Sequence, residues 1–143
     1  MIDSAMSLQR VLAINQAWHG SAGTLVANSS QYFEAPTAHG AGGKIKPGDR
    51  GDVRYPAWQV WSKPLAGRGR QAAVLVINLS EQAQSAEVSY AALGLRPNAG
   101  ESVAASDAWT GAAVTRGIGK TGLQLAAIRS HDSVFLVLAL DEL

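Results

Sequence analysis

The sequence predicts an all-β fold: a two-sheet antiparallel β-sandwich of about seven to eight strands, preceded by a short N-terminal helical segment. Short β-branched or apolar segments recur along the chain, turn residues separate them, and no long helical pattern lies between them. Two packed antiparallel sheets are the simplest architecture for such a pattern. With 143 residues the chain has the size of one domain, and it is large enough to fold around one core without disulfides.

The helical segment is predicted near the N-terminus, where Leu8, Val11 and Leu12 have the i, i+3, i+4 spacing of one helical face. A helix this short is not stable alone, so we expect it to dock on the rest of the protein. The predicted strands follow it, and they are Thr24–Ala27, Ala57–Lys63, Ala72–Leu79, Ser85–Tyr90, Glu101–Ala105, Gly122–Ile128 and Val134–Leu140.

Two of these strands contain stretches that are apolar on both faces. Ala73–Ile77 and Val134–Leu138 are therefore predicted to be central strands that are covered on both sides. Ser85–Tyr90 instead alternates between polar and less polar residues, as a half-buried strand does. The glycine-rich stretch from Asn28 to Pro56 is too long for a hairpin, so we expect a mobile excursion or a functional loop there.

Composition excludes several classes of function. Twelve Lys and Arg residues against eleven Asp and Glu residues do not supply the basic excess of a nucleic-acid binder. There are no cysteines, and the three histidines are scattered without metal-ligand spacing, so we predict no metal and no cofactor. The first ten residues do not resemble a signal peptide, and the apolar run Val134–Leu140 is far shorter than the ~20 residues that span a membrane.

No motif in the chain indicates catalysis. The sequence has no GxSxG nucleophile motif, and most of its acidic residues are predicted to lie in turns or on solvent-facing positions. The segment Gly117–Gly122 ends like a phosphate-binding loop, but Val114 replaces the first glycine of that motif and no helix is predicted to follow. We therefore predict a hairpin loop in this segment.

Three further motifs depend on exposure. Arg50-Gly51-Asp52 is the adhesion tripeptide, which also arises by chance in glycine-rich, charged loops. Two glycosylation sequons begin at Asn28 and Asn78. Asn28 is the better candidate, because Asn78 follows a predicted central strand.

The aromatic residues indicate a surface with a partner. Trp58 and Trp61 lie on opposite faces of one predicted strand, so only one of them can enter a given core. The aromatic surface either packs against a neighbouring domain, which we favour, or stacks against sugars. The candidates for carbohydrate contact are Trp18, Tyr32, Tyr55 and Trp58.

Six short blocks of the sequence resemble the α-galactosidase (melibiase) family of glycoside hydrolases, and they occur in the same order as in that family. They extend over nearly the whole chain: Val11–Gln16, Val60–Leu65, Ala73–Asn78, Leu93–Leu95, Asp107–Thr110 and Ser130–Val134.

The resemblance implies that the chain is the non-catalytic C-terminal β-sandwich of such an enzyme. Residues 1–23 would be the end of the last barrel helix and a connector, and residues 24–143 would be the sandwich. The catalytic (β/α)8 barrel needs about 250 residues and cannot lie within this chain, so no catalytic residue is assigned and the chain alone is expected to be inactive. The barrel would be its partner, and the residues expected to face it are Leu8, Val11, Leu12 and Trp18.

The intact enzyme would hydrolyse terminal α-galactosyl or α-N-acetylgalactosaminyl residues with retention of configuration. The family usually has Asp after the Asn-Gln of the first block, whereas this chain has Ala17, which leaves the sugar open. An extracellular, lysosomal or vacuolar location would follow from the resemblance. The alternatives are an autonomous carbohydrate-binding module for α-galactoside glycans and an adhesion module that presents Arg50-Gly51-Asp52.

Overall fold

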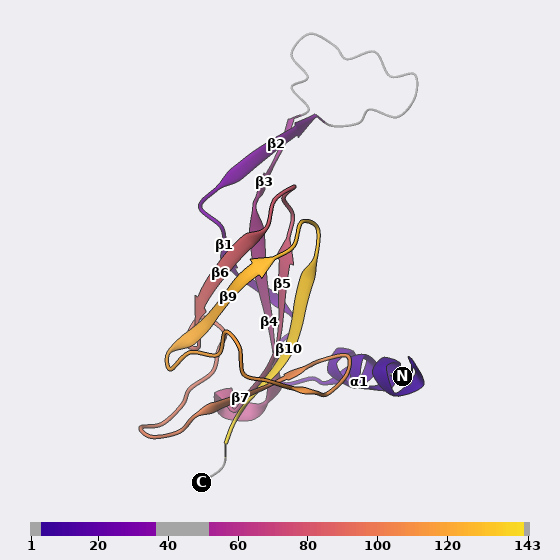
Figure 1. The fold of residues 1–143 in the computed structure, drawn as a ribbon. Helices are drawn as coiled ribbons and strands as arrows, with labels where there is room; N and C mark the ends of the chain where they lie inside the picture. The colour runs from indigo at the N-terminus through magenta and orange to yellow at the C-terminus, as the bar shows by residue number, and fades with distance from the viewer. Residues whose placement is uncertain (1–3, 37–51, 142–143) are drawn as a thin grey trace.

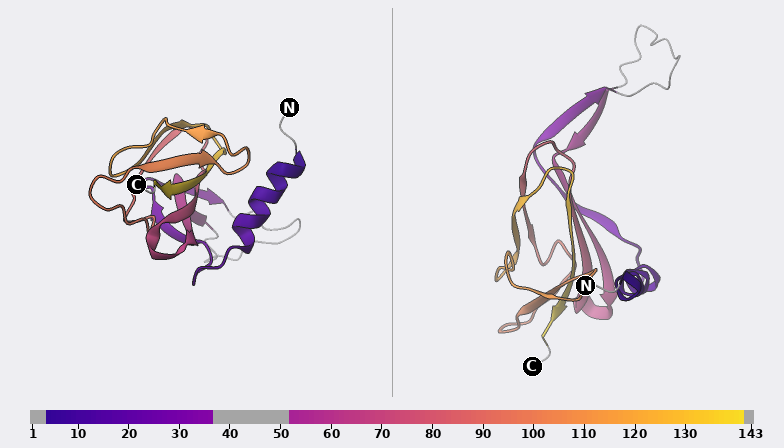
Figure 2. Two further views of the ribbon diagram at one scale, coloured as in Figure 1. Left: turned by 90° about the horizontal axis from the view of Figure 1, so that it is seen from below. Right: turned by 45° about the vertical axis from the view of Figure 1, so that its right-hand side comes forward.

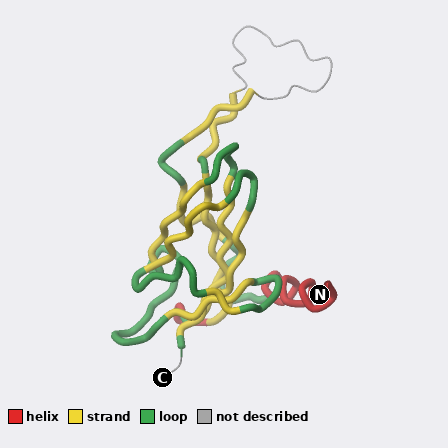
Figure 3. The backbone as a smooth tube through the Cα atoms, in the orientation of Figure 1, coloured by secondary structure: helices red, strands yellow, loops and turns green. Residues whose placement is uncertain are grey.

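The computed structural model describes residues 4–36 and 52–141, and within them it contains one α-helix, ten β-strands and one 3-10 turn (Figure 1, Figure 3). These elements are, in chain order, α1 (Ser4–Gln16), β1 (Thr24–Asn28), β2 (Tyr32–Pro36), β3 (Asp52–Pro56), β4 (Trp58–Ala66), η1 (Gly67–Gly69), β5 (Gln71–Asn78), β6 (Gln84–Ser89), β7 (Val103–Asp107), β8 (Ala113–Val114), β9 (Gly122–Ile128) and β10 (Ser133–Leu140).

The strands form a large sheet and a smaller one that packs on it. The large sheet has six strands in the order β1-β4-β5-β10-β7-β8, and β6 and β9 pair to form the second layer. Every pairing in both sheets is antiparallel. The prediction of an all-β, two-sheet antiparallel sandwich with a short N-terminal helix is therefore confirmed.

The core lies between the two sheets. It is filled by alternate residues of the large sheet, such as Val60, Val74 and Leu138, and by residues of the small sheet, such as Val88 and Leu123. Alternation is expected because successive side chains of a strand point to opposite faces. The middle of the inner face of the large sheet is thus covered, whereas Val26, Val103 and Val114 toward its edges are only partly buried. The other face of this sheet, called the outer face here, points away from β6 and β9.

All seven predicted strands are present, and their observed ends differ from the predicted ends by a few residues. β5 and β10 lie side by side in the middle of the large sheet, as their apolar sequences predict. Two residues, Ala113 and Val114, form the additional strand β8, which is too short to leave a pattern in the sequence.

The expectation for the stretch from Asn28 to Pro56 was wrong in one respect, because its two ends do pair as a hairpin. β2 and β3 are joined from Tyr32 opposite Pro56 to Pro36 opposite Asp52. The entropy of closing a loop grows only slowly with its length, so a long connection does not prevent such a pairing. Residues 37–51, including Arg50 and Gly51 of the adhesion tripeptide, lie outside the described residues.

The ribbon formed by β2 and β3 projects beyond one end of the sandwich, whereas α1 lies near the other end, beside the outer face of the large sheet (Figure 1, Figure 2). In the part of the chain that the structure describes, no helix has the length and apolar character needed to cross a membrane.

Candidate interdomain surface

Four apolar side chains form a continuous row across the outer face of the large sheet. Leu25 of β1 is opposite Trp61 of β4, Trp61 is opposite Leu75 of β5, and Leu75 is opposite Phe135 of β10. Because directly opposed residues of antiparallel strands share a face, their side chains lie next to one another. We call these four residues the outer row.

The outer row is extended by a further aromatic side chain and remains partly open to solvent. Trp109, in the turn after β7, meets Phe135 edge to face with 6.2 Å between ring centroids. Trp61 is 36% exposed, and Trp109 and Leu25 are more exposed still. A row of large apolar side chains in this state is unusual for a surface that faces only water.

Helix α1 and the outer row enclose an open groove of about 620 Å³. On the helix side it is lined by Val11, Leu12 and Ile14, and Trp18 lies just beyond the helix end. On the sheet side the lining includes Trp61, Leu75 and Phe135. The groove is thus lined by two tryptophans and by five other large apolar side chains.

Helix α1 is apolar on more than one side. Val11 and Ile14 are half-buried toward the groove, whereas Leu8 and Leu12 are 56% and 44% exposed, and no residue of α1 is fully buried. Trp18 is 70% exposed. A helix with apolar residues on several sides is typically buried between two bodies rather than exposed to solvent. Of the four predicted interface residues, Val11, Leu12 and Trp18 line the groove, and Leu8 does not.

The four candidates for carbohydrate contact do not lie together. Trp18 lines the groove, whereas Tyr32 and Tyr55 lie on the β2–β3 ribbon. Trp58 is half-buried and packs against the core, so Trp61 is the outward member of the tryptophan pair. On the ribbon, the Arg54 guanidinium lies 4.8 Å from the centroid of the Tyr32 ring.

Leu75, Phe135 and Trp109 were not among the residues proposed from the sequence, and of the tryptophan pair Trp58 rather than Trp61 was the named candidate. For Trp61, Leu75 and Phe135 the sequence does contain a signal, namely the alternation of residues along β4, β5 and β10. This alternation places them on the face opposite the buried residues. Which face of each strand is covered, however, depends on where β6 and β9 pack, and this is a property of the tertiary structure.

Asp107 and Glu101 use their carboxylates in local structure. Asp107 Oδ1 accepts hydrogen bonds from the backbone N–H groups of Trp109 (2.9 Å) and Thr110 (2.8 Å). Arg70 Nη1 donates to both carboxylate oxygens of Glu101, at 3.0 and 2.8 Å. That guanidinium, together with the backbone N–H of Asn98, lowers the pKa of Glu101 to about 2. No group of three or more His, Cys, Asp or Glu residues in residues 4–36 and 52–141 is placed to hold a metal ion.

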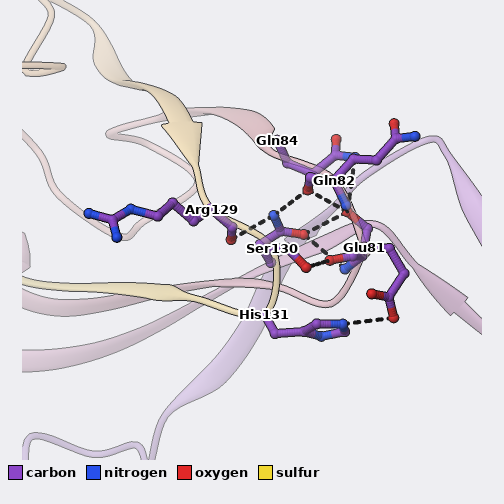
Figure 4. A network of polar contacts seen from close by, with 8 residues as sticks. Glu81, Gln82, Gln84, Arg129, Ser130 and His131 are labelled. Carbon is purple, nitrogen blue, oxygen red and sulfur yellow. Dashed lines mark hydrogen bonds and ion pairs between the residues drawn. The ribbon is translucent and has the colours of Figure 1, made fainter.

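The two sequons have very different surroundings. Asn28 is exposed at the end of β1, whereas Asn78 is only 1% exposed. The Asn78 amide nitrogen donates to the carbonyl oxygens of Gln82 (2.7 Å), Ile128 (3.0 Å) and Arg129 (2.9 Å). Figure 4 shows Gln82 and Arg129 in the polar network at this place. A glycan on this nitrogen is incompatible with the folded structure, and Asn28 remains the accessible sequon.

The segment Gly117–Gly122 forms the turn region between β8 and β9. Ile118 bridges Leu123, and the Gly119 N–H donates to the Gly122 carbonyl oxygen at 2.9 Å. The Tyr90 hydroxyl donates to the Gly119 carbonyl oxygen at 2.7 Å, and burial raises the pKa of Tyr90. Gly119 and Gly122 thus have a structural role in the tight turn that leads into β9. This turn agrees with the predicted hairpin loop.

The fold and this surface define a class: a β-sandwich domain with a covered inner core and an apolar outer face beside a short helix. The profile of the family described as the alpha galactosidase C-terminal beta sandwich domain matches residues 56–138, which is more than half of the chain. The chain belongs to this family. The resemblance inferred from the six sequence blocks is therefore confirmed.

Two solved structures are similar to part of the chain. One is a protein of Bacillus halodurans C-125 with a provisional assignment as an α-N-acetylgalactosaminidase, with 18% identity and a TM-score of 0.49 over 62% of this chain and 20% of that one. The other is a variant of a GH27 β-L-arabinopyranosidase from Geobacillus stearothermophilus in complex with arabinose, with 24% identity and a TM-score of 0.45 over 58% of this chain and 17% of that one.

The match therefore spans about a fifth or less of the length of these two structures. A comparison with curated protein sequences found no match.

Proposed function

We propose that this chain is the non-catalytic C-terminal β-sandwich of a retaining glycoside hydrolase that acts on terminal α-galactosyl or α-N-acetylgalactosaminyl residues. Residues 1–23 are the end of the last barrel helix and a connector in this proposal, and residues 24–143 are the sandwich. Membership of the family of α-galactosidase C-terminal sandwiches supports it. A retaining reaction needs two carboxyl groups about 5–5.5 Å apart, and these belong to the barrel.

The observation that carries the proposal is the apolar surface formed by the outer row and α1. Trp61, Phe135 and Leu12 are large and apolar, yet they are only partly covered. Burying them against a second domain would stabilise both, since apolar area removed from water contributes about 25 cal/mol per Å². The catalytic barrel is the partner proposed for this surface.

The first experiment tests the catalytic side of the proposal. We expect the purified chain to show no turnover of a chromogenic α-galactoside above the uncatalysed rate. Measurable turnover by the chain alone would contradict its assignment as a non-catalytic domain.

The second experiment tests the partner. The chain is mixed with a separately produced catalytic barrel of the same family that lacks its own C-terminal domain, and complex formation is measured by calorimetry. We expect Trp61→Ser to weaken binding by at least about tenfold, because large aromatic anchors dominate interfaces. Glu87→Ser, on the solvent-facing side of β6, is the control and should leave the affinity unchanged. Equal binding by Trp61→Ser and the unmodified chain would overturn the assignment of this surface.

The rival function is a carbohydrate-binding module, and one observation favours it: Trp18 and Trp61 line the same groove. Calorimetric titration of the chain with methyl α-galactoside separates the two functions. Heat of binding that disappears in both Trp18→Ala and Trp61→Ala would support the carbohydrate-binding module, and its absence would support the interdomain role.

A further inference from the structure

We propose that two cationic side chains, Lys63 of β4 and Arg10 of α1, clamp α1 onto the outer face of the sandwich, so that helix and sheet present one fixed surface. The clamp is a property of this chain alone. Only its use in fixing the orientation of a partner domain rests on the function proposed above.

The first half of the clamp caps the C-terminal end of α1. Lys63 Nζ donates to the carbonyl oxygen of Ile14 at 2.8 Å and to that of Asn15 at 2.7 Å. The last carbonyl groups of a helix have no partner within the helix and carry the negative end of its dipole, so a cation there is stabilising. The last turn of α1 contains no basic residue of its own. The cation is therefore supplied from another element, across the groove.

The second half holds the middle of α1. Arg10 Nη1 donates to the carbonyl oxygen of Thr110 at 2.5 Å. The turn that carries this carbonyl is itself fixed by the two hydrogen bonds to Asp107 Oδ1 and by the Gly111 N–H, which donates to the Asp107 carbonyl oxygen at 2.8 Å.

Gly111 lies directly against the guanidinium of Arg10. Its φ is +72°, which favours glycine, and a Cβ at this position would lie 2.7 Å from Cζ of Arg10. Any larger residue at 111 would have to displace the guanidinium. The absence of a side chain at this position thus leaves the space that Arg10 occupies.

Packing does little to hold the helix. No residue of α1 is buried, and open cavities of about 620 and 360 Å³ lie along its contact with the outer face. A helix of 13 residues is marginal in water by itself. The polar contacts at Lys63 and Arg10 therefore add directed interactions to the partial packing of Val11 and Ile14.

Three of the six sequence blocks contribute residues to the clamp. Val11–Gln16 supplies the capped helix end, Val60–Leu65 supplies Lys63, and Asp107–Thr110 supplies the turn that binds Arg10. Val60 and Ala108 of these blocks are buried and serve the sandwich itself, whereas Lys63 and the Thr110 carbonyl contact α1. Three segments that are far apart in the chain thus meet where α1 contacts the sandwich.

Hydrogen exchange of the whole chain, followed by mass spectrometry, tests the clamp. Lys63→Met keeps the length of the side chain and removes its charge, and Arg10→Met does the same for the other half. In each variant we expect the backbone amides of α1 to exchange about five- to tenfold faster, in line with the strength of charge-assisted bonds at a partly exposed helix end. Exchange in β5 and β10 should not change.

Two further variants serve as controls. Lys120→Met removes an exposed lysine from the turn region between β8 and β9 and should leave α1 unaffected. Lys63→Arg keeps the cation and should retain most of the protection. If Lys63→Met or Arg10→Met folds poorly, Lys63→Gln or Arg10→Gln replaces it, and it should also accelerate exchange in α1.

The proposal is overturned if Lys63→Met and Arg10→Met leave exchange in α1 unchanged, or if Lys120→Met accelerates it as much as they do. Because this experiment contains no barrel, its failure would not affect the partner test. Conversely, failure of the barrel to bind would leave the clamp intact.

Discussion

At the scale of single residues, the most constrained side chain is Asn78. Its amide nitrogen donates to three carbonyl groups, and its Oδ1 accepts from both the N–H and the hydroxyl of Ser80, each at 2.8 Å. Through these bonds the turn after β5 is joined to the turn after β9, about fifty residues further along the chain. A buried side chain whose polar atoms are all paired specifies one arrangement of its surroundings.

Asn78→Ala would leave these buried groups without partners. We expect a loss of about 3 kcal/mol in the free energy of unfolding, since each buried polar group left unpaired costs about 1–3 kcal/mol. Urea denaturation measures the change. Asn28→Ala is the matched control, because Asn28 is exposed, and it should change the free energy by less than about 0.5 kcal/mol. A similar loss in both variants would contradict this role for Asn78.

Glu101 makes stability depend on pH. Its pKa falls from 4.5 to about 2 because Arg70 and the Asn98 N–H favour the ionised form in the folded state. The resulting stabilisation is fully present above the unfolded pKa of 4.5 and is lost as the pH falls through about 2. We therefore expect the wild type to be more stable than Glu101→Gln at neutral pH. The difference in the free energy of unfolding should shrink as the pH falls from 4.5 to about 2.

Urea midpoints measured at a series of pH values check this expectation. Glu87→Gln, at an exposed position of β6, is the control and should follow the pH dependence of the wild type. A gap between wild type and Glu101→Gln that stays constant down to the lowest pH would argue against the Arg70 contact in solution.

At the scale of elements, the seven predicted strands are all present, whereas β2, β3 and β8 were not predicted. β5 and β10 were identified as central strands because continuous apolar sequence is a local signal. β2 and β3 were not predicted as strands, because they form only through a pairing that joins residues about twenty positions apart. The helix was correctly placed, although its sequence alone does not reveal the clamp that holds it.

The pairing of β6 with β9 depends on the absence of a side chain at Gly122. Gly122 is opposite Ser89, and a Cβ at position 122 would lie 2.8 Å from Cα of Ser89 and closer still to the Val88 carbonyl oxygen. We expect Gly122→Ala to cost about 2 kcal/mol, as overpacking does. Thermal unfolding and urea titration measure the effect.

Gly67→Ala is the control for this prediction, since nothing lies within 4 Å of a Cβ at position 67. We expect a change of less than about 0.5 kcal/mol. If Gly122→Ala proves as well tolerated as Gly67→Ala, β6 and β9 must be further apart in solution than in the structure.

At the scale of the whole molecule, stability should be unevenly distributed. β5 and β10 are paired on both sides and pack on the core, whereas β2 and β3 pair only with each other among the described strands. A two-stranded ribbon without a packed face is marginal in water. The sandwich is thus expected to be the rigid part, and the ribbon a separate, weakly held extension.

Hydrogen exchange of the intact chain tests this gradient. We expect amides of β2 and β3 to exchange fastest among the strands and those of β5 and β10 slowest, with a difference of at least about a hundredfold. Protection of β2 and β3 equal to that of β5 would show that the ribbon is held by contacts of its own.

By itself, the sequence determined the two-layer antiparallel architecture, the central strands and the family, because strand periodicity, turn residues and short sequence blocks are local features. Only the tertiary structure decided which apolar side chains form the outer row, that Asn78 is a buried cross-link, and that Lys63 and Arg10 meet α1. These features join residues that are far apart in the chain, and their contacts depend on strand register and on which face of the sheet is covered.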